Sequence, residues 1–68
     1  MSTTSTYTVT GMTCGHCVAS VREEIAEISG VTSVDVTLED GAVRVVADRE
    51  IPREEIAGAV ADAGYSLV

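Results

Sequence analysis

The chain has 68 residues, of which 11 are Asp or Glu and 4 are Lys or Arg, so its formal net charge is −7. This length suits one small domain, and we expect a single domain over residues 1–68. The negative charge disfavours nucleic acid and anionic membranes as partners, and a hydrophobic content of 46% with 3% aromatic residues indicates a folded core of small side chains.

Alternating hydroxyl and apolar side chains predict a first strand over about Ser5 to Val9, which Gly11 ends. Apolar residues at helical spacing then predict an amphipathic helix with Cys17 in its first turn. We expect this helix to end at Ser29, with Gly30 in a left-handed conformation. The apolar positions of this helix are Val18, Val21, Ile25 and Ile28.

A second strand is predicted over Val31 to Leu38, because apolar and polar residues alternate along it. One face of that strand would carry Val34, Val36 and Leu38. The segment Glu39-Asp40-Gly41 is typical of a hairpin turn, so Ala42 to Ala47 should form a third strand, antiparallel to the second.

Pro52 suits the first turn of a second helix, where Glu54 and Glu55 would lie favourably in the helix dipole. The predicted buried stripe of this helix consists of Ile56, Ala59, Val60 and Ala63. Gly64 should end the helix, and residues 65–68 are apolar enough for a short last strand. The order βαββαβ predicts an α+β, ferredoxin-like fold, in which two helices cover one face of a four-stranded antiparallel sheet.

The residues that carry chemistry lie between the first strand and the first helix, in Gly11-Met12-Thr13-Cys14-Gly15-His16-Cys17. Two cysteines at C-x-x-C spacing can bind one soft metal ion or form one disulfide, but they are too few for a structural zinc site. Because Cys17 would lie in the first helical turn, unpaired amides and the helix dipole favour its thiolate. Cu(I) accepts two-coordinate ligation by soft thiolates, and such an open site permits transfer to a second cysteine pair.

At these residues the chain resembles the heavy-metal-associated domain family, which includes bacterial copper chaperones and metal-binding modules of copper-transporting P-type ATPases. The resemblance extends from the Gly-Met-x-Cys-x-x-Cys motif to the segment around Tyr65. It implies that Cys14 and Cys17 ligate Cu(I), that Met12 supports the loop as an apolar residue, and that Tyr65 lies beside the metal. The implied function is that of a copper chaperone that delivers its ion to a P-type ATPase or to a soluble domain of one.

Several roles stay open at this point. Met12 suits a core filler better than a third ligand, and His16 suits an exposed residue that tunes docking better than a ligand. Tyr65 is either an ordinary half-buried strand residue or a wall that limits solvent access to the thiolates. Thr13 could cap the helix or face water. The helix carboxylates are expected to face solvent; they are Glu23, Glu24, Glu27, Glu54, Glu55 and Asp62.

Other function classes also remain. The chain could be a regulatory module of a longer transporter, a thiol-disulfide redox protein or a mercury carrier, whereas nothing in the sequence suggests an enzyme active site. The chain contains no lysine, so an acidic surface would have to meet an arginine- or lysine-bearing partner. We expect a monomer, with a metal-bridged dimer as the alternative.

The expected location is the cytoplasm. The first six residues lack the basic and apolar segments of an export signal, and no segment approaches the roughly 20 apolar residues of a membrane span. Two cysteines are also fewer than a small secreted domain usually needs for its disulfides.

Overall fold

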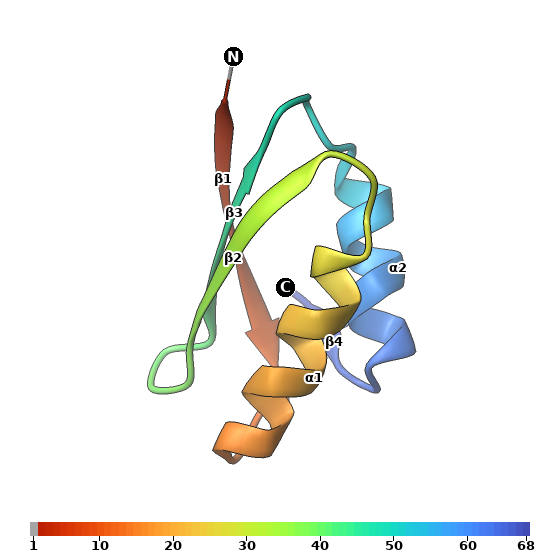
Figure 1. Ribbon diagram of the computed structural model, residues 1–68. Coiled ribbons are helices and arrows are strands. Elements are labelled where there is room, and N and C mark those ends of the chain that lie inside the picture. The colour runs from red at the N-terminus through yellow and green to blue at the C-terminus, as the bar shows by residue number, and fades with distance from the viewer. Residues whose placement is uncertain (1) are drawn as a thin grey trace.

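The computed structural model describes residues 2–68, so Met1, the first residue of the expected domain, lies outside it. The elements are β1 (Thr3–Thr10), α1 (Gly15–Ala26), β2 (Val31–Thr37), β3 (Ala42–Ala47), α2 (Arg53–Asp62) and β4 (Ser66–Leu67). All paired strands are antiparallel in the order β2-β3-β1-β4, and both helices cover the same face of the sheet (Figure 1). This arrangement confirms the predicted ferredoxin-like fold. None of the helices among residues 2–68 has the length and apolar character needed to cross a membrane.

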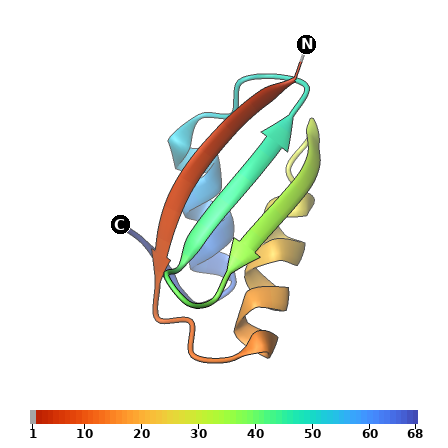
Figure 2. The same cartoon turned by 90° about the vertical axis from the view of Figure 1, so that its left-hand side faces the viewer.

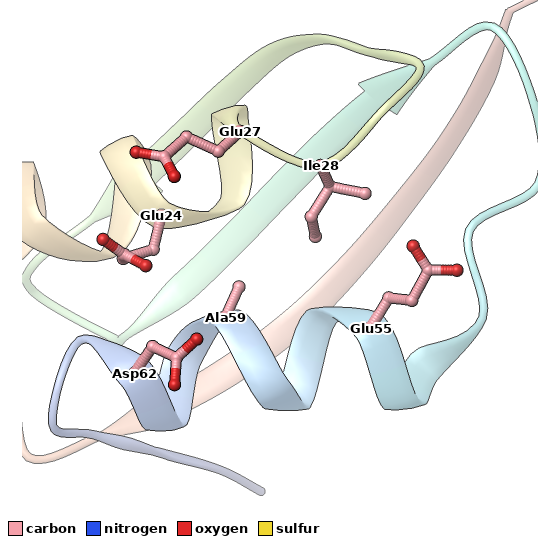
Figure 3. A pocket seen from close by; sticks show the side chains of 6 residues that line it. All are labelled: Glu24, Glu27, Ile28, Glu55, Ala59 and Asp62. Atoms are coloured by element: carbon pink, nitrogen blue, oxygen red, sulfur yellow. The ribbon is translucent and has the colours of Figure 1, made fainter.

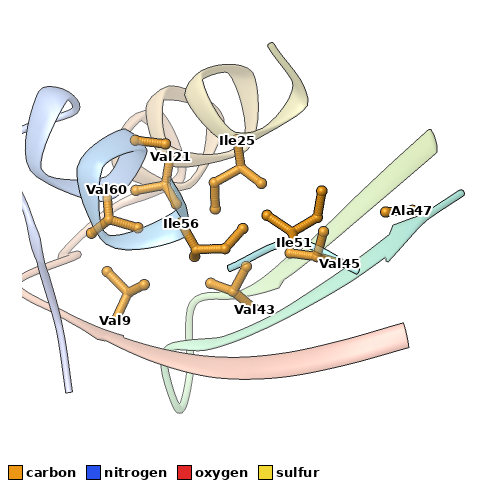
Figure 4. Close-up of a cluster of buried hydrophobic side chains, with 10 residues drawn as sticks. Val9, Val21, Ile25, Val43, Val45, Ala47, Ile51, Ile56 and Val60 are labelled. Atoms are coloured by element: carbon orange, nitrogen blue, oxygen red, sulfur yellow. The ribbon is translucent and has the colours of Figure 1, made fainter. Parts of the chain in front are cut away.

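The core lies between the sheet and the two helices, as the cluster of side chains in Figure 4 shows. Among residues 2–68, the buried members of this core are Val9, Val21, Ile25, Val43, Val45, Ala47, Ile51, Ile56, Ala59 and Val60. The strands contribute alternate residues to it, because successive side chains of a strand point to opposite faces of the sheet. The opposite face of β1 is formed by exposed threonines, so this face of the sheet meets water.

The first helix ends earlier than predicted. α1 stops at Ala26, and Ile28 lies in the following turn rather than in the helix, although it still packs against the core. The backbone N–H of Val31 donates to the carbonyl of Ile28 at 3.1 Å, and Gly30 has the expected left-handed φ of +94°. The helical spacing of apolar residues therefore continues past the last helical residue into a turn that buries the same side.

Other boundaries also differ from the predictions: β1 is longer than the predicted strand, and β4 is shorter. β2 ends at Thr37, and Leu38, which the sequence placed on its apolar face, is 40% exposed in the hairpin turn. Pro52 precedes α2 as its N-cap, with ψ of 140°, instead of lying in the first turn. Ala63 follows the last helical residue and is only half-buried, so the fully buried stripe of α2 is shorter than predicted.

Gly41 fixes the geometry of the β2–β3 hairpin against β1. Its φ is +73°, and a Cβ built on it would lie 2.4 Å from the carbonyl oxygen of Val9. The backbone N–H of Val9 also donates to the carbonyl of Gly41 at 2.9 Å. Only glycine combines this left-handed conformation with so close an approach between backbones.

The helix carboxylates do not all point into open solvent. A groove of about 270 Å³ runs between α1 and α2, and its floor is formed by Ile28 and Ala59. Four carboxylates line it, as Figure 3 shows: Glu24, Glu27, Glu55 and Asp62. Glu24 is half-buried there, which corrects the prediction of a fully solvated face, because the two helices pack closely enough to shield part of that side chain.

The buried residues of α1 lie in its second half. Val21 and Ile25 are completely buried, whereas none of the residues from Gly15 to Ser20 is. The N-terminal end of α1, next to the cysteines, therefore contributes little to the core.

Candidate metal site

The two cysteines lie where the β1–α1 loop enters the helix. Cys14 is the N-cap of α1 with extended backbone angles, and its carbonyl accepts hydrogen bonds from the N–H groups of Cys17 at 3.0 Å and Val18 at 3.3 Å. Cys17 is the third residue of the helix, in its first turn, as predicted. The backbone thus turns both side chains toward one point at the helix N-terminus, where unpaired amides favour negative charge.

The two sulfur atoms are 3.3 Å apart, and both cysteines are free thiols. This separation suits a hydrogen bond between one thiol and one thiolate. A linear arrangement with metal–sulfur bonds of about 2.3 Å, the length found in zinc–thiolate sites, would place the sulfurs about 4.6 Å apart. Binding of a two-coordinate ion would therefore replace the shared proton and move the sulfurs apart.

Within residues 2–68, no set of three or more His, Cys, Asp and Glu side chains converges as a metal site would require. The pair can thus offer an ion two sulfurs from this chain. Cys14 is exposed and Cys17 is half-buried, so the sulfurs are open to a second protein. Two soft ligands on an open loop favour a soft ion and its exchange over permanent structural binding.

The surroundings of Cys17 stabilise its thiolate. The pKa of Cys17 is lowered from 9.0 to about 6, chiefly by a hydrogen bond from the side chain of Tyr65 and further by hydrogen bonds from the backbone of Thr13 and from Cys14, against a smaller opposing effect of desolvation. The pKa of Tyr65 is raised in return, mainly by the same hydrogen bond. A thiolate near neutral pH is the form that binds metal.

Tyr65 lies beside the cysteine loop, not within a strand. It precedes β4, and a Cβ built on Gly11 would lie 3.3 Å from its ring atom Cδ1. Its half-buried ring also packs against the core. Tyr65 is thus half-buried and lies outside a strand, next to the loop that carries the cysteines.

The other candidate residues divide into two groups. Met12 is half-buried and packs against the core, as expected for a residue that supports the loop. The Thr13 hydroxyl lies 3.9 Å from the Cys17 sulfur and does not cap α1. His16 is exposed, which is consistent with the expected spectator, and its carbonyl accepts a hydrogen bond from Ser20 at 3.2 Å.

Removal of the Tyr65 hydroxyl should raise the pKa of Cys17. In Tyr65→Phe the main hydrogen bond to the thiolate is lost, so we expect a smaller thiolate fraction at pH 7, measured by the ultraviolet absorbance of the thiolate across a pH titration. Tyr7→Phe, on the half-buried face of β1, is the matched control and should leave the titration unchanged. An unaltered Cys17 pKa in Tyr65→Phe would contradict the assigned contact.

The lowered pKa of Cys17 also predicts how the stability of the metal-free protein depends on pH. The folded pKa of about 6 lies below the ordinary value of 9.0, so thiolate formation stabilises the metal-free fold fully above about pH 9, and this contribution is lost as the pH falls through about 6. Tyr65→Phe should therefore flatten the rise in melting temperature over this pH window.

Comparison with known proteins gives a consistent result. The model of the heavy-metal-associated domain family matches residues 6–66. The copper chaperone CopZ of Staphylococcus aureus (strain JH9) is 43% identical over 61 residues, which cover 88% of this chain and 90% of the relative. A solved structure described as the CopZ metallochaperone has a TM-score of 0.90 at 39% identity, covering 97% of this chain and all of that one. A copper binding domain from HMA7, a P-type ATPase, has a TM-score of 0.87 at 32% identity and covers 96% of this chain and 89% of that domain.

Proposed function

Because the chain belongs to the heavy-metal-associated domain family, we propose that it is a copper chaperone that binds one Cu(I) through Cys14 and Cys17 and delivers it to a copper-transporting P-type ATPase or its soluble metal-binding domain. The observation that carries this proposal is the pair of sulfurs, 3.3 Å apart at the N-terminus of α1, with Cys14 exposed and Cys17 half-buried. Met12, Tyr65 and His16 are assigned supporting, shielding and solvent-exposed positions around that pair. The proposed location is the cytoplasm.

The proposed class of function is inferred from the similar proteins. The similarity to a relative named as a copper chaperone supports a binding and transfer role, and we assign the chain that role without catalysis. We assign residues 1–68 to one domain, in which a single chain supplies both sulfurs of the site. The open two-sulfur site supports transfer, because a second cysteine pair can approach the ion before the first releases it.

The proposed mechanism begins with thiolate formation. The Tyr65 side chain and the backbone of Thr13 stabilise the negative charge on Cys17, and Cys14 lies at the exposed edge of the loop as the second sulfur for the ion. The incoming partner then contacts Cys14 first, because this cysteine is the more exposed of the two. Met12 holds the loop on the core while the sulfurs change their separation.

Copper transfer to a soluble metal-binding domain of a copper P-type ATPase tests the proposal. The copper-loaded protein is mixed with the metal-free domain, and the copper content of each is measured after separation. Transfer in both directions toward one equilibrium supports a chaperone. Copper that stays on this chain, with the partner domain still able to take copper from a small-molecule donor, would contradict it.

Association with this partner should depend on salt. The carboxylates beside the interhelical groove give the α1–α2 face a negative charge. The association rate with a basic partner should therefore fall as the ionic strength rises, because exposed charges are screened beyond roughly 10 Å at 0.1 M salt. Neutralisation of Glu24 and Asp62, as Glu24→Gln/Asp62→Asn, should lower that rate and weaken its salt dependence. Asp35→Asn, on the opposite face of the sheet, is the control and should leave the rate unchanged. A rate that does not respond to salt would contradict docking through this face.

A further inference from the structure

One side of β1 is largely without a neighbouring strand. β3 pairs with β1 from Thr3 to Thr8, whereas β4 pairs with it only at Val9 and Thr10. The last contact on the β4 side is a hydrogen bond from the N–H of Val68 to the carbonyl of Thr8 at 2.8 Å. Among residues 2–68, no strand lies next to the Thr3–Tyr7 segment on this side, and Figure 2 shows β1 along the margin of the sheet.

The hydrogen-bonding groups at this open edge can be assigned from the two sides of β1. The N–H of Val9 donates toward the β3 side, to Gly41, and the carbonyl of Thr8 accepts on the β4 side, from Val68. Because residues of a strand alternate in the side to which their N–H and C=O groups point, Thr4 and Thr6 direct these groups to the open edge. Both residues keep their side chains on the water-facing side of the sheet.

The open edge lacks the features that usually prevent strand pairing. Edge strands are commonly protected by charged side chains, proline or β-bulges. The other edge of the sheet, β2, has both Asp35 and a register shift between Val31 and Ser33. The segment Thr3–Tyr7 contains no charged residue and no proline, and it pairs with β3 in an unbroken register.

The flank of α2 on the same side carries a positive residue next to the sheet. Glu55 and Asp62 line the groove toward α1, and Ile56 and Val60 point into the core, so helical spacing places Arg53 and Ala57 on the other flank next to the sheet, with Glu54 and Ala61 beyond them toward solvent. A hydrogen bond of 2.8 Å from Arg53 to the carbonyl of Val68 confirms that this flank faces the β4 side. Two copies with a net charge of −7 each therefore meet Arg53, rather than a carboxylate, as the charged residue of α2 nearest to this edge.

We propose that this edge is a self-association surface, on which the Thr3–Tyr7 segments of two copies of the chain pair antiparallel about a two-fold axis at Ser5. Thr4 then lies opposite the partner's Thr6, and each of these two pairs exchanges two N–H···O hydrogen bonds. Thr3 lies opposite the partner's Tyr7. The Thr3–Tyr7 segment of one copy covers the whole open edge of the other copy. It then lies end to end with that copy's β4, along the same side of β1.

Such a dimer leaves the metal sites free. The cysteine loop follows the C-terminal end of β1, and the two β1 strands run in opposite directions, so the two loops lie at opposite ends of the joined sheet. Self-association therefore needs no metal and does not block transfer to another protein. This property separates the proposed dimer from one bridged by metal through the cysteines.

Sedimentation of the metal-free, reduced protein tests the proposal. An interface of one strand pair is small and hence weak, so we expect the average mass to rise from one chain toward two between about 10 µM and about 1 mM protein. Because both copies are acidic, salt should strengthen the association by screening their repulsion. Amide exchange at Thr4 and Thr6 should slow as the protein concentration rises. A mass of one chain throughout this range would overturn the proposal.

Variants locate the contact. Thr6→Pro removes an outward N–H without touching the β3 pairing and should abolish association, whereas Thr6→Ala keeps that N–H and should still associate. Thr4→Glu/Thr6→Glu places like charges opposite one another, and it should also abolish association if Thr6→Pro fails to fold. Cys14→Ser/Cys17→Ser should dimerise as before. Persistent association in the folded Thr6→Pro or the glutamate variant, or its loss in the cysteine variant, would overturn the proposal.

Discussion

Replacement of either Cys14 or Cys17 by serine should abolish tight Cu(I) binding. Each substitution removes one of the two sulfurs that the chain brings together, and the serine hydroxyl is a hard ligand that a soft ion does not favour. Loss of a residue that only hydrogen-bonds to a metal ligand can lower metal affinity roughly 100-fold, and loss of a ligand itself should lower it further. Competition with a Cu(I)-specific chelator under anaerobic, reducing conditions measures the change.

His16→Ala is the control within the same loop. The side chain of His16 is exposed, and the variant should keep the affinity of the parent chain. If both serine variants also keep it, the proposed ligand pair is wrong. If His16→Ala loses affinity as the serine variants do, the histidine is a ligand and its assignment as a spectator is wrong.

The same titration separates the alternative functions. A competition series with Cu(I), Hg(II) and Zn(II) ranks the ions that the cysteine pair binds, whereas transfer of Hg(II) but not of Cu(I) to a partner's cysteine pair would favour the mercury carrier. A thiol-disulfide redox protein would instead reduce disulfide substrates catalytically in the absence of metal. We expect no such turnover.

Gly41→Ala should cause the largest loss of stability among single substitutions outside the core. The left-handed conformation costs a residue with a Cβ about 1–2 kcal/mol, and overlap with the backbone of Val9 adds about 1–3 kcal/mol. The new Cβ would lie 2.4 Å from the Val9 carbonyl oxygen, which belongs to a strand held on both sides and cannot rotate away as a side chain could. For a domain of 68 residues this approaches the total free energy of unfolding.

Gly58→Ala is the matched control for the Gly41 substitution. Gly58 lies inside α2, and a Cβ built on it meets no atom within 4 Å. Alanine there should raise the free energy of unfolding by about 0.5–1 kcal/mol, because glycine disfavours the helix interior. Urea denaturation of the three proteins measures both effects. Equal stability of Gly41→Ala and the parent chain would show that the β2–β3 turn moves away from β1 at little cost.

The sequence predicted the fold well where buried and exposed residues alternate regularly along a strand. The strands β1 and β3 were found because each alternates between the core and water, and the left-handed Gly30 was found because a chain reversal needs it. The end of α1 was predicted too late, because Ile28 continues the apolar spacing while lying in a turn. Leu38 continues the alternation of β2 in the same way, yet it lies outside the strand.

Only part of the candidate site could be predicted from the sequence. The cysteines and Met12 lie together in one motif, and the spacing of four between Thr13 and Cys17 could have indicated the contact between those two side chains. The position of Tyr65 beside Cys17 came from the family resemblance, because the two residues are distant in sequence and their contact depends on how α2 returns to the sheet. The shielding of Glu24 likewise depends on the packing of two helices, which no local pattern reports.

The uneven burial of α1 has a consequence for the way metal is exchanged. Val21 and Ile25 anchor the second half of the helix, whereas the turn that contains Cys17 has no fully buried side chain. The sulfurs can therefore separate through a local rearrangement of the first turn, at a small fraction of the free energy of global unfolding. A variant that weakens the core, such as Ile25→Val, would unfold more readily and still exchange copper at the parent rate.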